Sequence, residues 1–189
     1  GALLLLSFDG RDTARRATEA VAMADGRPGN DLLIAHWWEH RNAAVDEYIR
    51  LMAGAGILGR HALVETVEVA GTWSVLRDVY HDMKNALTAE ADIVGCHLSH
   101  VYPDGACLYF TLGSACSDDA TAATIHDRWW QVAMTACLNA GGSISHHHGI
   151  GRVKSPWLAD ELGGFFDVLV AVKHALDPNN IMNPGVLGL

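Results

Sequence analysis

The sequence DIVGCHLSHVYPDGACLYFTL, residues 92–112, gives the strongest indication of the fold. Within it, Tyr102-Pro103-Asp104-Gly105 places a proline and an Asp-Gly pair between two apolar runs. Turn residues of these types between two β-rich segments are typical of a hairpin. We therefore predict two antiparallel strands, over Asp92–Val101 and Ala106–Leu112.

The segments next to the hairpin carry strand and helix patterns in alternation. Residues Ala62–Ala70 alternate in polarity, which predicts a strand. Thr72 can cap a helix from Trp73 to about Thr88. After the hairpin, Ser117-Asp118-Asp119 is a helix start, and this helix is expected to run to about Asn139. The residues expected to face the core in the first of these helices are Val75, Leu76, Val79, Met83 and Leu87.

The two ends of the chain carry further elements. The apolar run Ala2–Phe8 predicts a buried strand, and helices are expected from Thr13 to about Ala24 and from Asp31 to about Ala53. A last helix is expected over Gly164–Ala175, before Asp177-Pro178. The helix that begins at Asp31 would bury a stripe formed by Leu33, Trp37, Ala44, Tyr48 and Leu51.

These elements predict an α+β fold in which helices cover one face of a mainly antiparallel sheet, with residues 1–189 forming one domain. Lys and Arg number 13 against 22 Asp and Glu, which gives a formal charge of -9. Nucleic-acid binding depends on basic residues that neutralise phosphates, so this balance disfavours it. No segment is long and apolar enough for a membrane span.

The four cysteines form no C-x-x-C pair, which argues against a zinc ribbon or a thioredoxin motif. They fit a reducing compartment, and we expect the protein to be cytoplasmic. Apolar residues begin almost at once and no methionine starts the chain. We therefore expect a fragment or a processed product.

The expected strand Ala62–Ala70 has an unusual distribution of polar residues. Val64, Thr66 and Glu68 share one face, whereas Val67 and Val69 share the other. Two polar side chains on the face of Val64 are unusual if that face only packs against a core. This face of the sheet is therefore a candidate for function.

The sequence GGSISHHHGIGRVK, residues 141–154, is the most distinctive candidate site. His146, His147 and His148 lie between glycines, which permit unusual backbone angles and close approach of the backbone to a ligand. Imidazole is the side chain whose unperturbed pKa lies near neutral pH. Three consecutive histidines suit proton transfer or anion binding better than one shared metal ion, and we predict no metal site. A solvated loop without function is the alternative.

Other histidines and two further polar residues are weaker candidates. His36 and His40 have helical i, i+4 spacing, but the stretch lacks the H-E-x-x-H motif and two exposed histidines are expected. His97 and His100 are expected to point to opposite faces of one strand. A role in acid–base chemistry for Tyr109, or in anion binding for Arg50, is not decided by their spacing.

The chain resembles the alkyldihydroxyacetonephosphate synthases, which belong to the FAD-dependent vanillyl-alcohol oxidase superfamily. The triple histidine in its glycine frame carries the resemblance, together with YPDGACLYF at Tyr102–Phe110 and DPNNI at Asp177–Ile181. The segments Tyr48–Arg50 and Glu65–Trp73 add to it. The resemblance spans nearly the whole chain, and DPNNI is shared by many FAD-linked oxidases.

The resemblance implies roles for individual residues. Tyr109 matches the catalytic acid/base tyrosine, Arg50 the substrate-binding arginine, and His146, His147 and His148 the active-site histidine run. Thr66 falls where the family carries a substrate-binding hydroxyl group. The tail Gly185–Leu189 is expected to pack near the active site, and Asn183 to contact the cofactor.

The resemblance also implies that this chain is one of two domains of a longer enzyme. This chain would be the C-terminal cap domain, with a ferredoxin-like fold, and FAD would be held mainly by an N-terminal domain that is absent from the chain. The fragment alone would then be inactive. Its partners would be an anionic small-molecule substrate and its own FAD domain, with formation of a homodimer left open.

Two other functions stay open. Asn183-Pro184-Gly185 is more like the FAD-linked 2-hydroxy-acid dehydrogenases that act on D-lactate or glycolate, in which a single Glu-His-Gly replaces the histidine run and some members bind a divalent metal. In the synthases, by contrast, an acyl group is exchanged for an alkoxy group without net oxidation. The third function is a non-catalytic α+β module that binds a metal or an anion.

Overall fold

The structure is a computed structural model that describes residues 10–27, 29–43, 46, 50 and 62–189. The chain divides into two compact units, Gly1–Ile49 and Arg50–Leu189. The strand expected over Ala2–Phe8 lies outside the described residues. That the whole chain is one domain stays a prediction.

The first unit contains two helices, α1 (Thr13–Met23) and α2 (Asp31–His40). The prediction of α1 is confirmed. Helix α2 ends at His40 and residues 41–42 form a turn, so a single unbroken helix from Asp31 was wrong. Residues 43, 46 and 50 are helical, and the other residues of the expected helix up to Ala53 lie outside the described residues. Leu33 and Trp37 are 43% and 44% exposed, so the burial expected of these two was wrong. The other members of the expected stripe, Ala44, Tyr48 and Leu51, lie outside the described residues. Helical periodicity shows which residues share a face, whereas burial also requires a packing partner.

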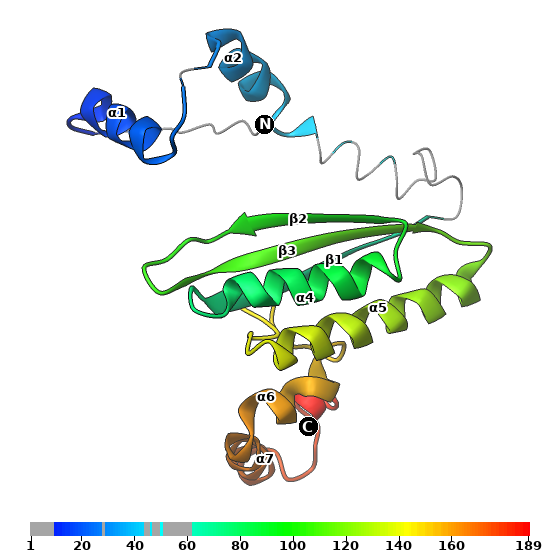
Figure 1. Cartoon of the computed structure of the whole chain (residues 1–189). Helices are drawn as coiled ribbons and strands as arrows, with labels where there is room; N and C mark the ends of the chain where they lie inside the picture. Colours follow the sequence, from blue (N-terminus) through cyan, green and yellow to red (C-terminus); the bar gives the residue numbers. More distant parts are fainter. Residues whose placement is uncertain (1–9, 28, 44–45, 47–49, 51–61) are drawn as a thin grey trace. The chain divides into compact units, whose positions relative to one another are not determined.

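The second unit is built on a three-stranded antiparallel sheet, in the order β1-β3-β2 (Figure 1). Its strands are β1 (Ala62–Thr72), β2 (Ile93–Ser99) and β3 (Gly105–Ala115). The hairpin is confirmed, and its turn is closed by the N–H of Tyr102, which donates to the carbonyl of Gly105 at 2.8 Å. β1 continues past Gly71, where the sequence suggested that it ends.

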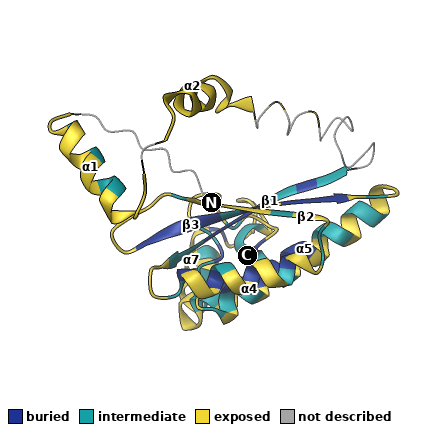
Figure 2. Cartoon of the chain, turned by 45° about the horizontal axis from the view of Figure 1, so that its top comes forward, coloured by how far each residue is buried: buried dark blue, intermediate teal, exposed yellow. Residues whose placement is uncertain are grey.

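Helices α4 (Leu76–Thr88) and α5 (Asp119–Asn139) cover one face of this sheet (Figure 1). Figure 2 shows buried positions on both helices, alternating with exposed ones. The carboxylate of Asp118 caps α5, as predicted, by accepting from the N–H of Thr121 at 2.8 Å. Fully buried core residues include Val67, Val69, Val79, Met83, Leu87, Phe110 and Trp129.

The start of α4 differs from the prediction. Residues 73–75 form a turn, and the helix begins at Leu76 without a side-chain cap. The hydroxyl of Thr72 bonds that of Ser74 at 2.8 Å. Thr72 therefore stabilises the turn before the helix and not the helix terminus itself.

The C-terminal segment follows α5. It contains η1 (Ser155–Trp157), α6 (Leu158–Leu162), α7 (Gly164–Leu176) and η2 (Val186–Gly188). Helix α7 was predicted, whereas η1 and α6 are too short to show periodicity and were not. The α+β fold with its antiparallel sheet is confirmed. In the described part of the chain, no helix combines the length and the apolar character that crossing a membrane requires.

The face of the sheet opposite α4 and α5 carries polar side chains. The register places Glu68 opposite Tyr109, and Tyr109 opposite His97. Directly opposed residues in an antiparallel sheet point to the same side, so these three side chains form a row across all three strands. We call this side of the sheet the polar face.

Candidate functional site

The histidine loop, residues 141–154, is attached to the edge of β1. Ser143 and Ala70 exchange two backbone hydrogen bonds, of 2.8 and 3.0 Å. Gly142 permits this approach, because a Cβ atom there would lie 2.7 Å from the Sγ of Cys137 and 2.9 Å from Val79. The glycine frame therefore has a structural cause at this position.

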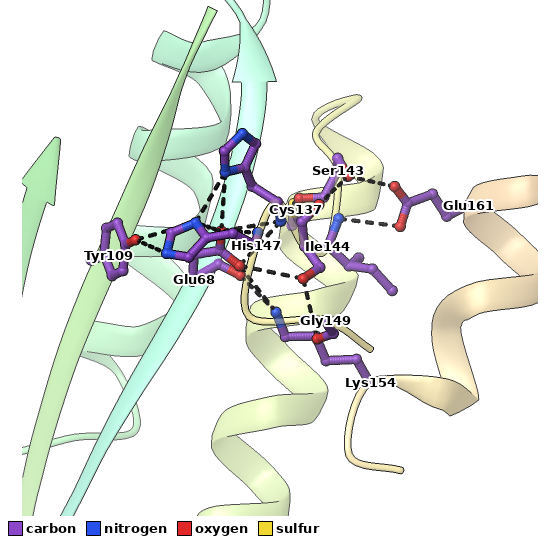
Figure 3. Close-up of polar contacts among 11 residues, drawn as sticks. Glu68, Tyr109, Cys137, Ser143, Ile144, His147, Gly149, Lys154 and Glu161 are labelled. Atoms are coloured by element: carbon purple, nitrogen blue, oxygen red, sulfur yellow. Dashed lines mark hydrogen bonds and ion pairs between the residues drawn. The ribbon is translucent and has the colours of Figure 1, made fainter. Parts of the chain in front are cut away.

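Glu68 holds the loop on the polar face (Figure 3). Its fully buried carboxylate accepts from the backbone N–H of His146, at 3.1 Å to both oxygens, and from that of His147 at 3.0 Å. The hydroxyl of Ser145 donates to the same carboxylate at 3.3 Å. One side chain of β1 thus fixes three successive residues of the loop.

Lys154, at the end of the loop, also contacts Glu68. Its buried ammonium donates to the backbone carbonyl of Glu68 at 3.0 Å and lies 3.5 Å from a carboxylate oxygen. Burial raises the pKa of Glu68, but the N–H groups of His147 and His146 and the charge of Lys154 outweigh it, so the pKa is lowered. Burial lowers the pKa of Lys154, and Glu68 opposes this shift.

Tyr109 and His147 form the closest contact of the site (Figure 3). The phenol oxygen lies 2.6 Å from Nε2 of His147, and Nδ1 of the same ring lies 3.1 Å from Oε1 of Glu68. Burial lowers the pKa of His147, and it raises the pKa of Tyr109, with Glu68 adding to the latter shift. The two shifts favour the uncharged forms of the imidazole and the phenol.

Other imidazoles surround this pair. The ring of His148 lies 5.4 Å from that of Tyr109, and the ring of His100 lies 4.5 Å from that of His147. The rings of His97 and His100 each lie 6.1 Å from Tyr109, so the prediction that they point to opposite faces was wrong. β2 ends at Ser99, and the positive φ of His100, 49°, turns its side chain back to the polar face.

A hollow of about 470 Å³ opens beside His146. Hydroxyl groups and an acidic side chain line it, and none of its lining residues in the described part of the chain is Lys or Arg. A second hollow, of about 380 Å³, lies on the helix side of the sheet and is almost wholly apolar. We assign the first hollow to the site because it adjoins the histidines. Its lining includes Thr72, Tyr102, Asp104, Cys107, Ser143, Ser145 and His146.

Three further residues and the C-terminal tail were predicted for the site. Thr66 lies on the polar face, two residues before Glu68 on β1. Arg50 is exposed, and its role in substrate binding stays a prediction. Asn183 is also exposed, with a φ of 48°. The tail contacts the far end of the loop, where the N–H of Leu187 donates to the carbonyl of Gly151 at 3.0 Å, and its packing near the active site stays a prediction.

The prediction did not include Glu68, Lys154 or Cys107 in the site. The only signal for Glu68 was its position on the polar side of an alternating strand, and Lys154 was notable only as a charge that follows the histidines. Donor atoms of Glu68, Cys107, His146 and His147 lie within 4.8 Å of one another, a set that could hold a metal ion. A metal ion bound there would compete for the carboxylate of Glu68 with the backbone N–H groups of His146 and His147, which already donate hydrogen bonds to it.

Comparison with known proteins assigns the family. A family model described as "FAD linked oxidases, C-terminal domain" matches residues 1–187. The chain belongs to this family. The resemblance seen in the sequence is thereby confirmed at the level of the FAD-linked oxidases, a family that implies FAD as the cofactor.

This FAD-linked oxidase domain is similar to proteins of differing activity. Alkyldihydroxyacetonephosphate synthase of Trypanosoma brucei brucei is 42% identical over 97 residues, which cover 50% of this chain and 15% of that protein. An uncharacterized FAD-linked oxidoreductase of Escherichia coli, YgcU, is 32% identical over 131 residues, covering 65% and 27%. Glycolate oxidase subunit GlcD of Bacillus subtilis is 32% identical over 105 residues, covering 53% and 21%. The domain thus spans about a quarter of these relatives or less.

Proposed function

We propose that this domain carries the substrate-binding and proton-transferring residues of an FAD-dependent enzyme like alkyldihydroxyacetonephosphate synthase. The reaction would exchange the acyl group of a dihydroxyacetone phosphate ester for an alkoxy group. The observation that carries the proposal is the 2.6 Å contact between Tyr109 and His147 beside the hollow. The identity of 42% to a synthase supports this substrate class over others.

Proton transfer is the chemistry that these two residues can supply. A phenol that donates to a neutral imidazole can pass its proton to that ring and then accept one from a bound substrate. The buried carboxylate of Glu68, 3.1 Å from the far nitrogen of His147, stabilises the positive charge that the ring then acquires. The exchange involves no net oxidation, so the residues of this chain need only bind the substrate and move protons.

The residues fit the substrate side of a flavin reaction. FAD, when bound, supplies the electron-accepting chemistry, whereas the protein supplies orientation and proton transfer. The nearby cations are engaged, since Lys154 contacts Glu68 and Arg152 donates to the carbonyl of Pro184 at 2.8 Å. We therefore place the phosphates of FAD on a separate N-terminal domain, with Asn183 as the contact from this chain.

The substrate contacts are proposals of the same kind. Arg50 would bind the anionic group of the substrate, and Thr66 would donate or accept a hydrogen bond on the polar face. His148, whose ring lies 5.4 Å from that of Tyr109, would bind substrate oxygens, and so would His146, whose ring lies 5.2 Å from that of His147, because both are exposed. The described residues that line the hollow include no Lys or Arg, so we assign it to an uncharged part of the substrate.

A 2-hydroxy-acid dehydrogenase is the second candidate, favoured by the similarity to a glycolate oxidase subunit. In this reaction His147 would remove a proton from the substrate, and FAD, when bound, would supply the electron-accepting chemistry. The non-catalytic module loses support, because the chain belongs to a family of FAD-linked oxidases.

The test uses the complete protein that carries this chain, purified with FAD. We expect exchange activity with acyl-dihydroxyacetone phosphate and a long-chain alcohol, lost in His147→Gln and kept in His36→Gln, an exposed histidine of α2. Turnover of D-lactate or glycolate with an artificial electron acceptor, without exchange activity, would instead establish the dehydrogenase. Tight binding of FAD to the 189-residue chain alone would contradict the placement of the cofactor.

A further inference from the structure

The histidine loop contains a contact that constrains where its protons lie. Nδ1 of His146 and Nδ1 of His147 are 3.0 Å apart. A neutral imidazole carries one hydrogen, on one of its two nitrogens. Two ring nitrogens at hydrogen-bond distance need one proton between them, because two would clash and two bare nitrogens would repel.

Glu68 decides which nitrogen carries that proton. An ionised carboxylate only accepts hydrogen bonds. Its Oε1 lies 3.1 Å from Nδ1 of His147 but 3.9 Å from Nδ1 of His146. The negative charge of the carboxylate favours a hydrogen on the nearer nitrogen over a bare lone pair, so Nδ1 of His147 is the donor in the hydrogen bond to the neighbouring ring.

The opposite ends of the two rings follow from this choice. Nε2 of His147 is then bare, and it is the ring nitrogen nearer to the phenol oxygen of Tyr109, at 2.6 Å against 3.4 Å for Nδ1. Nδ1 of His146 is bare as well, so its hydrogen lies on Nε2, the nitrogen that remains for a ligand. His146 lines the hollow of about 470 Å³, so a molecule bound there would lie beside the ring that carries this N–H.

We propose that Glu68 is a positioning residue that sets opposite tautomers in two adjacent histidines. His147 presents a proton acceptor to Tyr109, and His146 presents a hydrogen-bond donor beside the hollow. The backbone N–H groups of both residues bind the same carboxylate, which keeps the two rings in register with it. The use of these nitrogens in turnover rests on the proposed function, whereas the tautomers themselves do not.

The test is NMR of the 189-residue chain, labelled with ¹⁵N at histidine and studied at neutral pH without FAD or substrate. Replacing His146 and His147 by glutamine, one at a time, assigns their signals. We expect the hydrogen of His147 on Nδ1 and that of His146 on Nε2. The opposite arrangement, or rapid averaging of both rings between tautomers, would overturn the proposal without any further variant.

Two matched substitutions separate the carboxylate's effect on the rings from its effect on the loop. Glu68→Gln provides an amide that can donate as well as accept, so we expect His147 to lose its preference for the Nδ1 tautomer. Glu161→Gln is the control, since Glu161 holds the same loop through Ser143 and the N–H of Ile144. An unchanged tautomer in Glu68→Gln, or equal changes in both variants, would contradict the assignment to Glu68.

The NMR experiment and the activity assay test separate claims. The tautomers are measured without cofactor or substrate, so their failure would leave the proposed reaction standing. Absent exchange and dehydrogenase activity would refute the proposed function and leave the tautomers as measured.

Discussion

Neighbouring residues of the central strand β3 meet two different environments. Phe110 is fully buried on the helix side, where its ring stacks on that of Tyr80 at 6.2 Å. Tyr109 is half-buried on the polar face and bonds His147. Alternate residues of a strand face opposite sides of the sheet, so neighbouring residues of β3 contribute one to the core and one to the candidate site. Substitutions at adjacent positions should have unlike effects.

The largest effect is expected on activity, from Tyr109→Phe. This change removes only the hydroxyl, so stability should be nearly unchanged, whereas turnover of the complete enzyme should fall by about 10²- to 10⁴-fold. Steady-state kinetics beside a thermal unfolding curve measures both quantities. Retained turnover would show that Tyr109 is not the acid or base.

The next largest effect is expected on stability, from Phe110→Ala. The cavity that it leaves among α4, α5 and the sheet should lower the free energy of unfolding by about 3–5 kcal/mol. Denaturant unfolding of the 189-residue chain measures the loss. A loss of less than about 1 kcal/mol is typical of tolerated core substitutions. Such a result would mean that the helix side at Phe110 is not packed more tightly than the polar face.

A smaller loss is expected from Gly142→Ala, which tests how closely the histidine loop lies against the helix layer. The new methyl group would meet Cys137 and Val79 below 3.0 Å, and such overpacking costs about 1–3 kcal/mol. Gly95→Ala is the control, because its nearest neighbour would lie at 3.9 Å. Equal stability of both variants would place the loop farther from α4 and α5.

The smallest effect is expected on the pH dependence of stability. The folded-state pKa of Glu68 lies below its unfolded value of about 4.5, so its contribution is complete above that pH and is lost as the pH falls through the folded-state pKa. Glu68→Gln should remove this part of the acid slope. The contribution of Asp177, whose pKa Lys173 lowers to about 2, should remain. If the free energy of unfolding fell equally with decreasing pH in the variant and in the unmodified chain, the lowered pKa of Glu68 would be contradicted.

Local patterns predicted most of the helix side of the fold. The hairpin followed from its turn residues, the start of α5 from the capping carboxylate of Asp118, and the buried residues of α4 from helical spacing. These features depend on residues close together in the sequence. The extent of α2 and its burial could not be predicted, because they depend on what packs against it.

The candidate site was predicted only in part. The histidine loop stood out by composition, and its proximity to Tyr109 came from a family resemblance, since no local rule joins residues 38 positions apart. The role of Glu68 was missed for the same reason, because the backbone groups that it binds lie 78 and 79 positions later in the chain. Contacts of this length follow from the packing of the loop and leave no periodic signal.

The bridge between Ala70 and Ser143 has a consequence for self-association. β1 is an edge strand of the three-stranded sheet, and a bare edge offers its free amides and carbonyls to the strands of other molecules. The histidine loop occupies one residue of this edge with two backbone hydrogen bonds. The same loop that presents the imidazoles thus covers this point of the edge against intermolecular strand pairing, and changes that detach it should expose the amide and carbonyl of Ala70 to other chains.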